Sequence, residues 1–525
     1  MSGGGRGILK NTAVVGAMTA LSRVLGLVRE MFQSRLIGAG VEQSAFTLAF
    51  AIPNMMRKLF GEGALTAAFV PVFKGEVEAQ RMESARRLAR AVMTMSLLML
   101  VAISVLAVAG LSVALHWGAA ISERMSLTLR LTRLLVPYMI FICGAAFGMG
   151  VLNALGKFAA ASLMPCLLNV VWIGALGALC FFPGMTLSSR IVWVSGAILF
   201  AGFLQMAFMF WCMKRRGVSP LPSRVGWNDP NTRLVWRNMF VAAVGAGAVQ
   251  INYMLDQILA QAAAPWAAGV IGYAERLMDL PLGIVGVAFG TVLLPTFAGC
   301  FAKGDVEGAR AAFLSSTDNL LFVMIPAAVG LGILAPDMTR VIYEGKAFDA
   351  TATLRVGRAV ACYAIGLGFF GLQKTLVPWF QAQKDMKTSL AVSVKMVFLN
   401  ATLNILAVLL LPEEWRHVGL AASTVFCAGV GCVWLAVLAR RKNGTLGLMS
   451  LVRPVGRTLV ASAAMGAALW VTRSWFATRS WTGVWASVMQ LGALVVLGSV
   501  VYFGTHFVFA RRTFAARLRA LRKRR

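Results

Sequence analysis

The sequence predicts an all-α polytopic membrane protein with about 14 transmembrane helices, and three observations support this prediction. Hydrophobic residues make up 59% of the 525 residues and charged residues only 13%, against about 25% charged residues in ordinary soluble domains. Apolar runs of roughly 20 residues, each long enough to cross a hydrocarbon layer as a helix, recur along the whole chain. No polar linker of the kind that joins soluble domains separates them.

Short polar or basic stretches separate the apolar runs and so define the spans. A cleaved signal peptide is not expected, because Arg23 and Arg29 interrupt the first apolar stretch, and the first span is therefore counted. The predicted spans are residues 9–37, 43–73, 89–116, 131–155, 159–182, 189–213, 234–263, 266–298, 316–335, 356–383, 388–411, 418–440, 455–475 and 485–510.

Basic residues indicate how the spans are oriented. Lys and Arg concentrate in the loops that follow even-numbered spans and in the carboxyl-terminal stretch RRTFAARLRALRKRR. Because basic loops stay on the cytoplasmic side, we expect both termini to be cytoplasmic. The net charge of +30 then reflects topology and contact with anionic lipid headgroups, and nucleic acid is not an expected partner.

The two halves of the chain carry related segments. Pro71 matches Pro295, each followed two residues later by Phe, and Lys157 matches Lys384; the offsets are 224 and 227 residues. Six spans separate the paired elements, so both copies have the same orientation in the membrane. Parallel repeats of this kind are typical of transporters, with a substrate site between two six-helix lobes.

This repeat predicts four parts of the chain. An N-terminal six-helix lobe covers residues 1–216, and a C-terminal six-helix lobe covers residues 217–445. Helices 13 and 14 follow at 446–510, and residues 511–525 form a basic cytoplasmic tail.

Charged residues lie at membrane depth in spans 1, 2 and 8, where each charge at a helix centre costs about 2.5–3.5 kcal/mol. A surplus of arginine facing a cavity suits an anionic substrate, because the guanidinium fork matches phosphate or pyrophosphate and keeps its charge. The alternative is internal pairing between neighbouring charges. The predicted substrate-binding residues are Arg23, Arg29, Arg57 and Arg276, and the supporting acidic residues are Glu30, Glu62, Glu275 and Asp279.

A second group of polar residues lies in spans 7, 11 and 12. Asp256 follows Asn252 by four residues on span 7, and Asn404 follows Asn400 by four residues on span 11. Together with Thr424, their oxygen atoms suit a small cation such as Na⁺. The preferred alternative is that these Asn residues make hydrogen bonds between helices.

Catalytic chemistry is not expected. The eight Cys and three His residues show no spacing typical of a metal site, a disulfide framework or a catalytic triad. A membrane-embedded transferase would need clustered acidic residues and sizeable loops, and the longest loop, around residues 214–233, holds one acid, Asp229.

Three segments together resemble the MurJ (MviN) family of lipid II flippases, within the multidrug/oligosaccharidyl-lipid/polysaccharide exporter superfamily. They are SRVLGLVREMFQSRLIGAG (22–40), PNMMRKLFGEGALTAAFVPVF (53–73) and GYAERLMDLPLGIVGVAFGTVLLPTFA (272–298). The resemblance implies a monomer in the bacterial inner membrane that moves lipid II, an undecaprenyl-pyrophosphate-linked disaccharide-pentapeptide, to the outer leaflet for peptidoglycan synthesis. The alternative is an exporter of another lipid-linked oligosaccharide or of small drugs.

The resemblance also implies roles for single residues. The four predicted arginines match those that line the family's central cavity, and Glu30 stands where many members have Asp. Ser44 falls where relatives often carry an acid, and Asn404 occupies the place of an acidic ligand of a sodium site. Helices 13 and 14 would form a groove for the lipid tail. No cofactor is implied, and coupling would use Na⁺ or the membrane potential.

Overall fold

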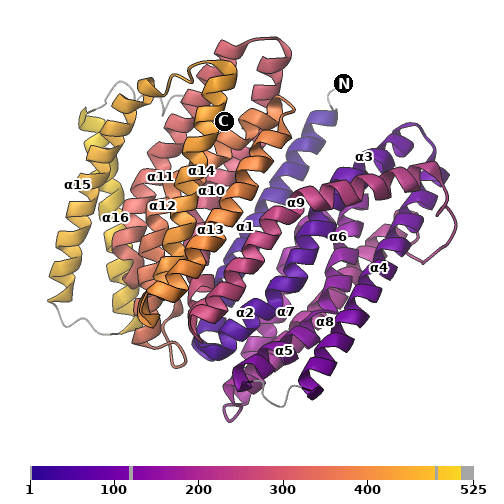
Figure 1. Cartoon of the computed structure of the whole chain (residues 1–525), viewed down its shortest axis with the longest axis horizontal. Coiled ribbons are helices and arrows are strands. Elements are labelled where there is room, and N and C mark those ends of the chain that lie inside the picture. Colours follow the sequence, from indigo (N-terminus) through magenta and orange to yellow (C-terminus); the bar gives the residue numbers. More distant parts are fainter. Residues whose placement is uncertain (1–2, 118–121, 479–482, 510–525) are drawn as a thin grey trace. The chain divides into compact units, whose positions relative to one another are not determined.

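The computed structural model describes residues 3–117, 122–478 and 483–509, without the side chains of 3–14, 62, 64, 244–246, 248, 249, 284–291 and 484. Every regular element within these ranges is helical (Figure 1). The elements are α1 (Gly3–Ile37), α2 (Val41–Met56), the π-helix η1 (Arg57–Ala64), α3 (Leu65–Glu78), α4 (Met82–Trp117), α5 (Glu123–Leu135), α6 (Tyr138–Ala154), α7 (Phe158–Ala178), η2 (Leu179–Phe181), α8 (Leu187–Lys214), α9 (Pro230–Ala263), α10 (Ala267–Ala302), α11 (Val306–Tyr343), α12 (Ala350–Ala382), α13 (Met386–Leu410), α14 (Glu413–Asn443), η3 (Leu448–Leu451), α15 (Val452–Ala477) and α16 (Val484–Phe509).

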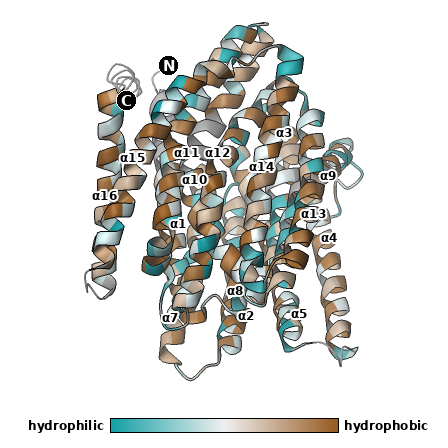
Figure 2. Cartoon of the chain, turned by 60° about the vertical axis from the view of Figure 1, so that its left-hand side comes forward, coloured by the Kyte–Doolittle hydropathy of each residue, from teal (hydrophilic) through white to brown (hydrophobic). Residues whose placement is uncertain are grey.

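Each predicted span corresponds to a helical segment, and the all-helical membrane fold is confirmed. Among the described residues, ten helices are long and apolar enough to cross a membrane. Hydrophobic residues run along most of α15 and α16 (Figure 2). Several helices extend past the predicted apolar limits because an aspartate caps them in the polar layer. The side chain of Asp305, for example, accepts a hydrogen bond from the backbone of Gly308 and starts α11 ten residues before the predicted span.

Two predicted spans are not single α-helices. The second span changes from α2 into the π-helix η1 and then into α3, close to Pro53. Proline lacks the backbone N–H that an α-helix needs, and π-helical turns are rare and frequently occur at functional sites. The fourth span begins earlier than expected, as α5, and is interrupted at Pro137 before α6 begins.

The described chain forms two compact units. The first contains residues 1–269 and 345–348, and the second contains residues 270–344 and 349–525. The first unit therefore extends past the predicted lobe boundary at residue 216. The reason is that α9 packs on α2, η1 and α3 of the first unit.

Within the first unit, α1 packs on α7, α2 packs on α5, and α6 packs on α8. Phe69, Phe73 and Phe147 form an aromatic core, with ring centroids 4.8–5.2 Å apart between neighbours.

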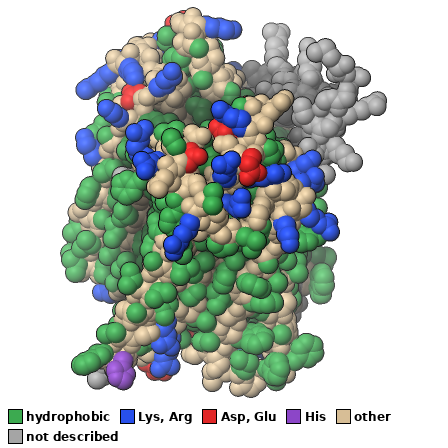
Figure 3. Space-filling view, turned by 90° about the vertical axis from the view of Figure 1, so that its right-hand side faces the viewer, with side chains coloured by type: hydrophobic (Ala, Val, Ile, Leu, Met, Phe, Trp, Pro, Cys, Tyr) green, Lys and Arg blue, Asp and Glu red, His purple; other side chains and the backbone are tan. Residues whose placement is uncertain are grey.

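On the face shown in Figure 3, lysine and arginine side chains gather towards one end, and hydrophobic side chains cover much of the remainder. This distribution fits a surface with one end in a polar layer and the rest in hydrocarbon.

Within the second unit, α11 packs on α12 and α15, and α14 packs on α12 and α13. Trp379 is buried among Phe297, Phe301 and Phe313, with centroid distances of 5.1–5.6 Å. Helices α15 and α16 pack along each other beside α11 (Figure 1). These two helices thus extend the second unit through contacts with α11.

Turn geometry supports the internal repeat. After α3, Gln80 has φ 59° and the N–H of Arg81 donates to the carbonyl of Glu76; after α10, Gly304 and Asp305 do the same towards Cys300. These turns differ by 224 residues, as the proline match predicts. The second pair needs a correction, because left-handed Lys384 corresponds to left-handed Gly156 rather than to Lys157. The offset there is therefore 228, because the turn conformation, and not the lysine, recurs.

Candidate functional site

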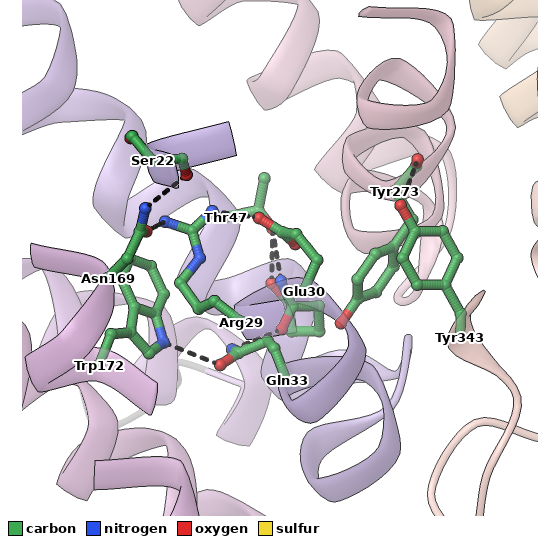
Figure 4. A network of polar contacts seen from close by, with 10 residues as sticks. Ser22, Arg29, Glu30, Gln33, Thr47, Asn169, Trp172, Tyr273 and Tyr343 are labelled. Atoms are coloured by element: carbon green, nitrogen blue, oxygen red, sulfur yellow. Dashed lines mark hydrogen bonds and ion pairs between the residues drawn. The ribbon is translucent and has the colours of Figure 1, made fainter. Parts of the chain in front are cut away.

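A partly buried charge network lies in the first unit between α1 and α7. Nη1 of Arg29 donates to Oδ1 of Asn169 at 3.0 Å, and Nη2 pairs with the carboxylate of Glu30 (Figure 4). The side chains of Arg29 and Glu30 are only 12% and 15% exposed. The adjacent acid offsets part of the cost of burying the arginine. One buried atom, Nε of Arg29, has no hydrogen-bond partner among the described residues.

An indole ring completes the environment of Arg29. The guanidinium lies 4.4 Å from the ring centroid of Trp172, one helical turn beyond Asn169 on α7. The indole Nε1 donates to Oε1 of Gln33 at 3.1 Å, and Nε2 of Gln33 donates to Oε1 of Gln43 at 3.0 Å. A cation held against a tryptophan face gains about 0.5–2 kcal/mol. These two hydrogen bonds link α7 to α1 and α1 to α2, so the position of Arg29 depends on three helices.

Arg23 has a different setting from Arg29. Its side chain is exposed, whereas that of Arg29 is mostly buried. A bend at Gly26 would allow the two arginines, which lie about 120° apart around a straight helix, to approach one ligand. However, α1 is one continuous α-helix through Gly26. Asn169 passes close to this glycine, with its Nδ2 3.8 Å from where a Cβ would lie, and donates to the carbonyl of Ser22.

The π-helix η1 carries the next basic pair. Nε and Nη2 of Arg57 both donate to Oδ1 of Asn54, at 3.1 and 3.0 Å, so one edge of the guanidinium is held by α2. The ammonium of Lys58 lies 5.1 Å from the ring centroid of Tyr253 on α9. The side chain of Glu62 lies outside those that the structure describes. The wider turn of η1 therefore presents a guanidinium and an ammonium from successive residues.

The remaining predicted charges lie on α10 in the second unit. Arg276 and Asp279 are exposed, and Glu275 is half-buried. All three take part in interactions, so none is an isolated charge. The predicted substrate-binding arginines are thus divided, with Arg23, Arg29 and Arg57 in the first unit and Arg276 in the second.

The polar residues considered for Na⁺ have hydrogen-bond partners. Nδ2 of Asn252 donates to Asp256 at 3.1 Å on α9 of the first unit. In the second unit, Nδ2 of Asn404 donates to Oδ1 of Asn400 at 3.1 Å, and Oδ1 of Asn404 accepts from Ser423. Nδ2 of Asn400 lies 3.4 Å from the hydroxyl of Thr424. These bonds link α13 to α14, and the described residues include no cluster of three or more His, Cys, Asp or Glu able to hold a metal.

Several residues of the network were not predicted from the sequence. Asn169 and Trp172 are three residues apart on α7 and therefore lie on one face of the helix. A polar side chain and an indole on one face of an apolar span could have indicated a polar contact with another helix. Gln33 and Gln43 gave a weaker sequence signal for such a contact. Ser44, expected where relatives carry an acid, is fully buried, and its hydroxyl accepts from the N–H of Gly269 at 2.9 Å. The Ser44 hydroxyl thus links α2 to the first turn of α10.

Comparison with known proteins identifies the family. The family described as "Lipid II flippase MurJ" matches residues 33–490. The chain belongs to the MurJ family. The "Probable lipid II flippase MurJ" of Rhizobium tropici is 34% identical over 464 residues, covering 87% of this chain and 86% of that protein. The protein of the same description from Rhizobium meliloti is 31% identical over 491 residues, covering 90% and 88%.

Solved structures share the fold. The structure titled "Lipid II flippase MurJ, inward closed conformation" superposes with a TM-score of 0.76 at 22% identity, covering 95% of this chain and 99% of that one. An inward-facing multidrug resistance MATE transporter of the MOP superfamily gives a TM-score of 0.67 at 16% identity, covering 83% and 99%. The fold is therefore that of MurJ and its MOP superfamily neighbours, as the sequence resemblance implied.

Proposed function

We propose that this chain is a lipid II flippase that moves the undecaprenyl-pyrophosphate-linked peptidoglycan precursor from the cytoplasmic to the outer leaflet. Membership of the MurJ family carries the proposal. The partly buried Arg29 network supports it, because fixed positive charge on a membrane-depth helix suits a pyrophosphate headgroup. Transport of this kind needs no covalent step, so the protein acts as a transporter and not as an enzyme.

The proposed headgroup ligands are Arg23, Arg29, Arg57 and Arg276. Arg29 donates to Asn169 and pairs with Glu30, and Arg57 donates to Asn54. These contacts fix the orientation of both guanidinium groups before substrate arrives. Preorganised arginine loses less side-chain entropy on binding. In this proposal the acids Glu30, Glu62, Glu275 and Asp279 balance the arginines while the site is empty.

Transport would proceed by alternating access, with the lipid tail remaining in hydrocarbon along the groove of α15 and α16. We propose that coupling uses Na⁺ or the membrane potential, which is worth about 2.3 kcal/mol per charge per 100 mV. The engaged oxygens of Asn400 and Asn404 favour the membrane potential. Lipid II translocation is measured in proteoliposomes with Na⁺ replaced by K⁺ at a fixed membrane potential. Only a sodium-coupled flippase would stop under these conditions.

The chain is a multi-pass inner-membrane protein, and we propose that it works as a monomer with both termini in the cytoplasm. The basic loop after α8 supports this orientation through the positive-inside rule. The tail at 511–525 lies outside the described residues. A fluorescent protein fused after Arg525 should fluoresce, and alkaline phosphatase fused there should be inactive; the opposite pattern would reverse the orientation.

The decisive experiment depletes the protein in its host and measures which leaflet holds lipid II. Wild type should restore export, whereas Arg29→Ala and Arg276→Ala, expressed at equal levels, should not. Arg457→Gln, which removes an exposed arginine of α15, serves as the control and should rescue. If depletion leaves the distribution of lipid II unchanged in a host with no redundant flippase, the cargo is another lipid-linked oligosaccharide or a small drug.

A further inference from the structure

A polar pocket opens at one end of the second unit, away from every residue considered above. It has a volume of about 450 Å³ and lies where the last turns of α11 and α15 meet the first turns of α16. Charged residues from two helices line it, namely Asp337 and Arg340 on α11 and Arg473 on α15. The proposed flippase mechanism places the lipid tail along α15 and α16 but gives the charged residues of this pocket no role.

The charges in the pocket are of both signs, and each arginine is only partly occupied. Nε of Arg473 donates to Oδ2 of Asp337, and Nε of Arg340 lies 3.5 Å from Oε2 of Glu344. The terminal nitrogens of both guanidinium groups donate no hydrogen bond within the described part of the chain. Oδ1 of Asp337 likewise accepts no hydrogen bond there. Each guanidinium thus retains the edge that binds a phosphate through two parallel hydrogen bonds, and a carboxylate oxygen remains for a cationic group.

The pocket also has an apolar side. Leu491 and Leu494 of α16 line it, together with Phe476 of α15. Leu494 belongs to the hydrophobic cluster that holds α11, α15 and α16 together. A ligand that matches both sides is therefore amphipathic, with a charged headgroup and a hydrocarbon chain.

The pocket lies at the ends of three helices that are long and apolar enough to span a membrane. Arg473 is four residues before the end of α15, and Arg340 is three residues before the end of α11. Trp475 and Trp485, at the adjoining ends of α15 and α16, are exposed. Exposed tryptophan at the ends of membrane-spanning helices marks the interface between hydrocarbon and water.

We propose that this pocket binds a phospholipid whose headgroup carries a phosphate and a primary ammonium group, as in phosphatidylethanolamine. The phosphate accepts from the free edges of Arg340 and Arg473, and the ammonium donates to Oδ1 of Asp337. An acyl chain follows Leu491 and Leu494 along α16. Bound lipid then holds α15 and α16 against α11 at the amino-terminal end of α16. The inference stands on the pocket alone and does not depend on the cargo of the flippase.

Native mass spectrometry tests the proposal on the full chain. The protein is reconstituted with equimolar phosphatidylethanolamine, phosphatidylglycerol and phosphatidylcholine of identical chains, and retained lipid is counted after gentle release. One phosphatidylethanolamine should remain bound in preference to the other two, and 10 mM inorganic phosphate should not displace it. Arg473→Gln and Arg340→Gln should each lower its occupancy at least about fivefold.

Two further variants make the test specific. Asp337→Asn removes the partner of the ammonium and should abolish the preference for phosphatidylethanolamine over phosphatidylcholine. Arg453→Gln, at the other end of α15, removes the same charge and should leave occupancy unchanged. Circular dichroism and the unfolding temperature confirm that each variant is folded. Equal retention of the three lipids, preference for phosphatidylglycerol, displacement by phosphate, or unchanged binding in the folded arginine variants would each overturn the proposal.

Discussion

Arg29 shows how a single charge is kept inside a membrane helix. Its acceptors come from the adjacent Glu30 and from Asn169 of another helix, and Trp172 covers its face. Removing one acceptor leaves a buried donor without a partner, which costs about 1–3 kcal/mol. The residue is therefore held by a network in which each member can be tested by substitution.

Asn169→Leu should destabilise the protein by about 1–3 kcal/mol, because Nη1 of Arg29 loses its acceptor and the carbonyl of Ser22 loses a donor. Thermal unfolding in detergent measures the loss. Asn169→Asp retains an acceptor for Arg29 and should lose less. Equal stability of the leucine variant and wild type would show that the network contributes nothing to folding.

Gly38 is a second position where a single residue decides local structure. It has φ +86°, and an added Cβ would lie 2.1 Å from the carbonyl oxygen of Ala347. Gly38→Ala should cost more than the ~1–2 kcal/mol of a left-handed backbone, because the loop at 345–348 must also shift. Gly16→Ala is the control: nothing lies within 4 Å, and alanine is favoured by about 0.5–1 kcal/mol inside a helix. Thermal unfolding should therefore shift in opposite directions, and equal shifts would contradict the geometry.

At the scale of elements, the turn between α12 and α13 is joined to the end of α14. Asp385 caps α13 by accepting from the N–H of Thr388 and also accepts from Nζ of Lys442 at 2.6 Å. The hydrogen bond from Lys442 is the main cause that lowers the pKa of Asp385 below its ordinary value. A carboxyl whose pKa is lower in the folded state adds stability above its unfolded pKa and loses it as pH falls through the folded pKa.

Asp385→Asn keeps the cap and removes the ion pair, so it isolates this effect. The variant should be less stable than wild type by about 0.2–1 kcal/mol at pH 7, the range for exposed ion pairs. The difference should shrink as pH falls below about 4, the unperturbed range of aspartate. Unfolding temperatures from pH 3 to pH 8 measure it, and a difference that does not vary with pH would show that Lys442 does not influence this carboxyl.

At the scale of the whole molecule, the two units repeat the same helix-ending turns with different residues. The left-handed position is Gln80 in one copy and Gly304 in the other, and likewise Gly156 and Lys384. Both non-glycine residues are exposed, so their side chains add no packing that offsets the strain. Each unit thus contains one turn with glycine at the left-handed position and one turn in which a residue other than glycine is strained there.

Gln80→Gly and Lys384→Gly should each stabilise the protein by about 0.5–1 kcal/mol, since glycine tolerates positive φ. Their effects should add in the double variant, because the positions lie in different units and share no partner. Gly156→Ala, with open space around it, should destabilise by a similar amount. Unfolding temperatures of the four variants test the repeat, and a destabilised Lys384→Gly would contradict the shared turn.

The sequence by itself determined the helical membrane fold, the positions of its spans and the repeat, because apolar length and periodic proline and phenylalanine are local properties of the chain. It also predicts charges at membrane depth in spans 1, 2 and 8. Tertiary structure alone decided that Asn169 and Trp172 orient Arg29, that η1 is a π-helix, and that α9 packs with the first unit. The contacts of Arg29 and the packing of α9 join residues more than a hundred positions apart. The π-helix η1 depends on the ring of Pro53 and on the helices packed against it. Neither kind of feature leaves a periodic signal in one sequence.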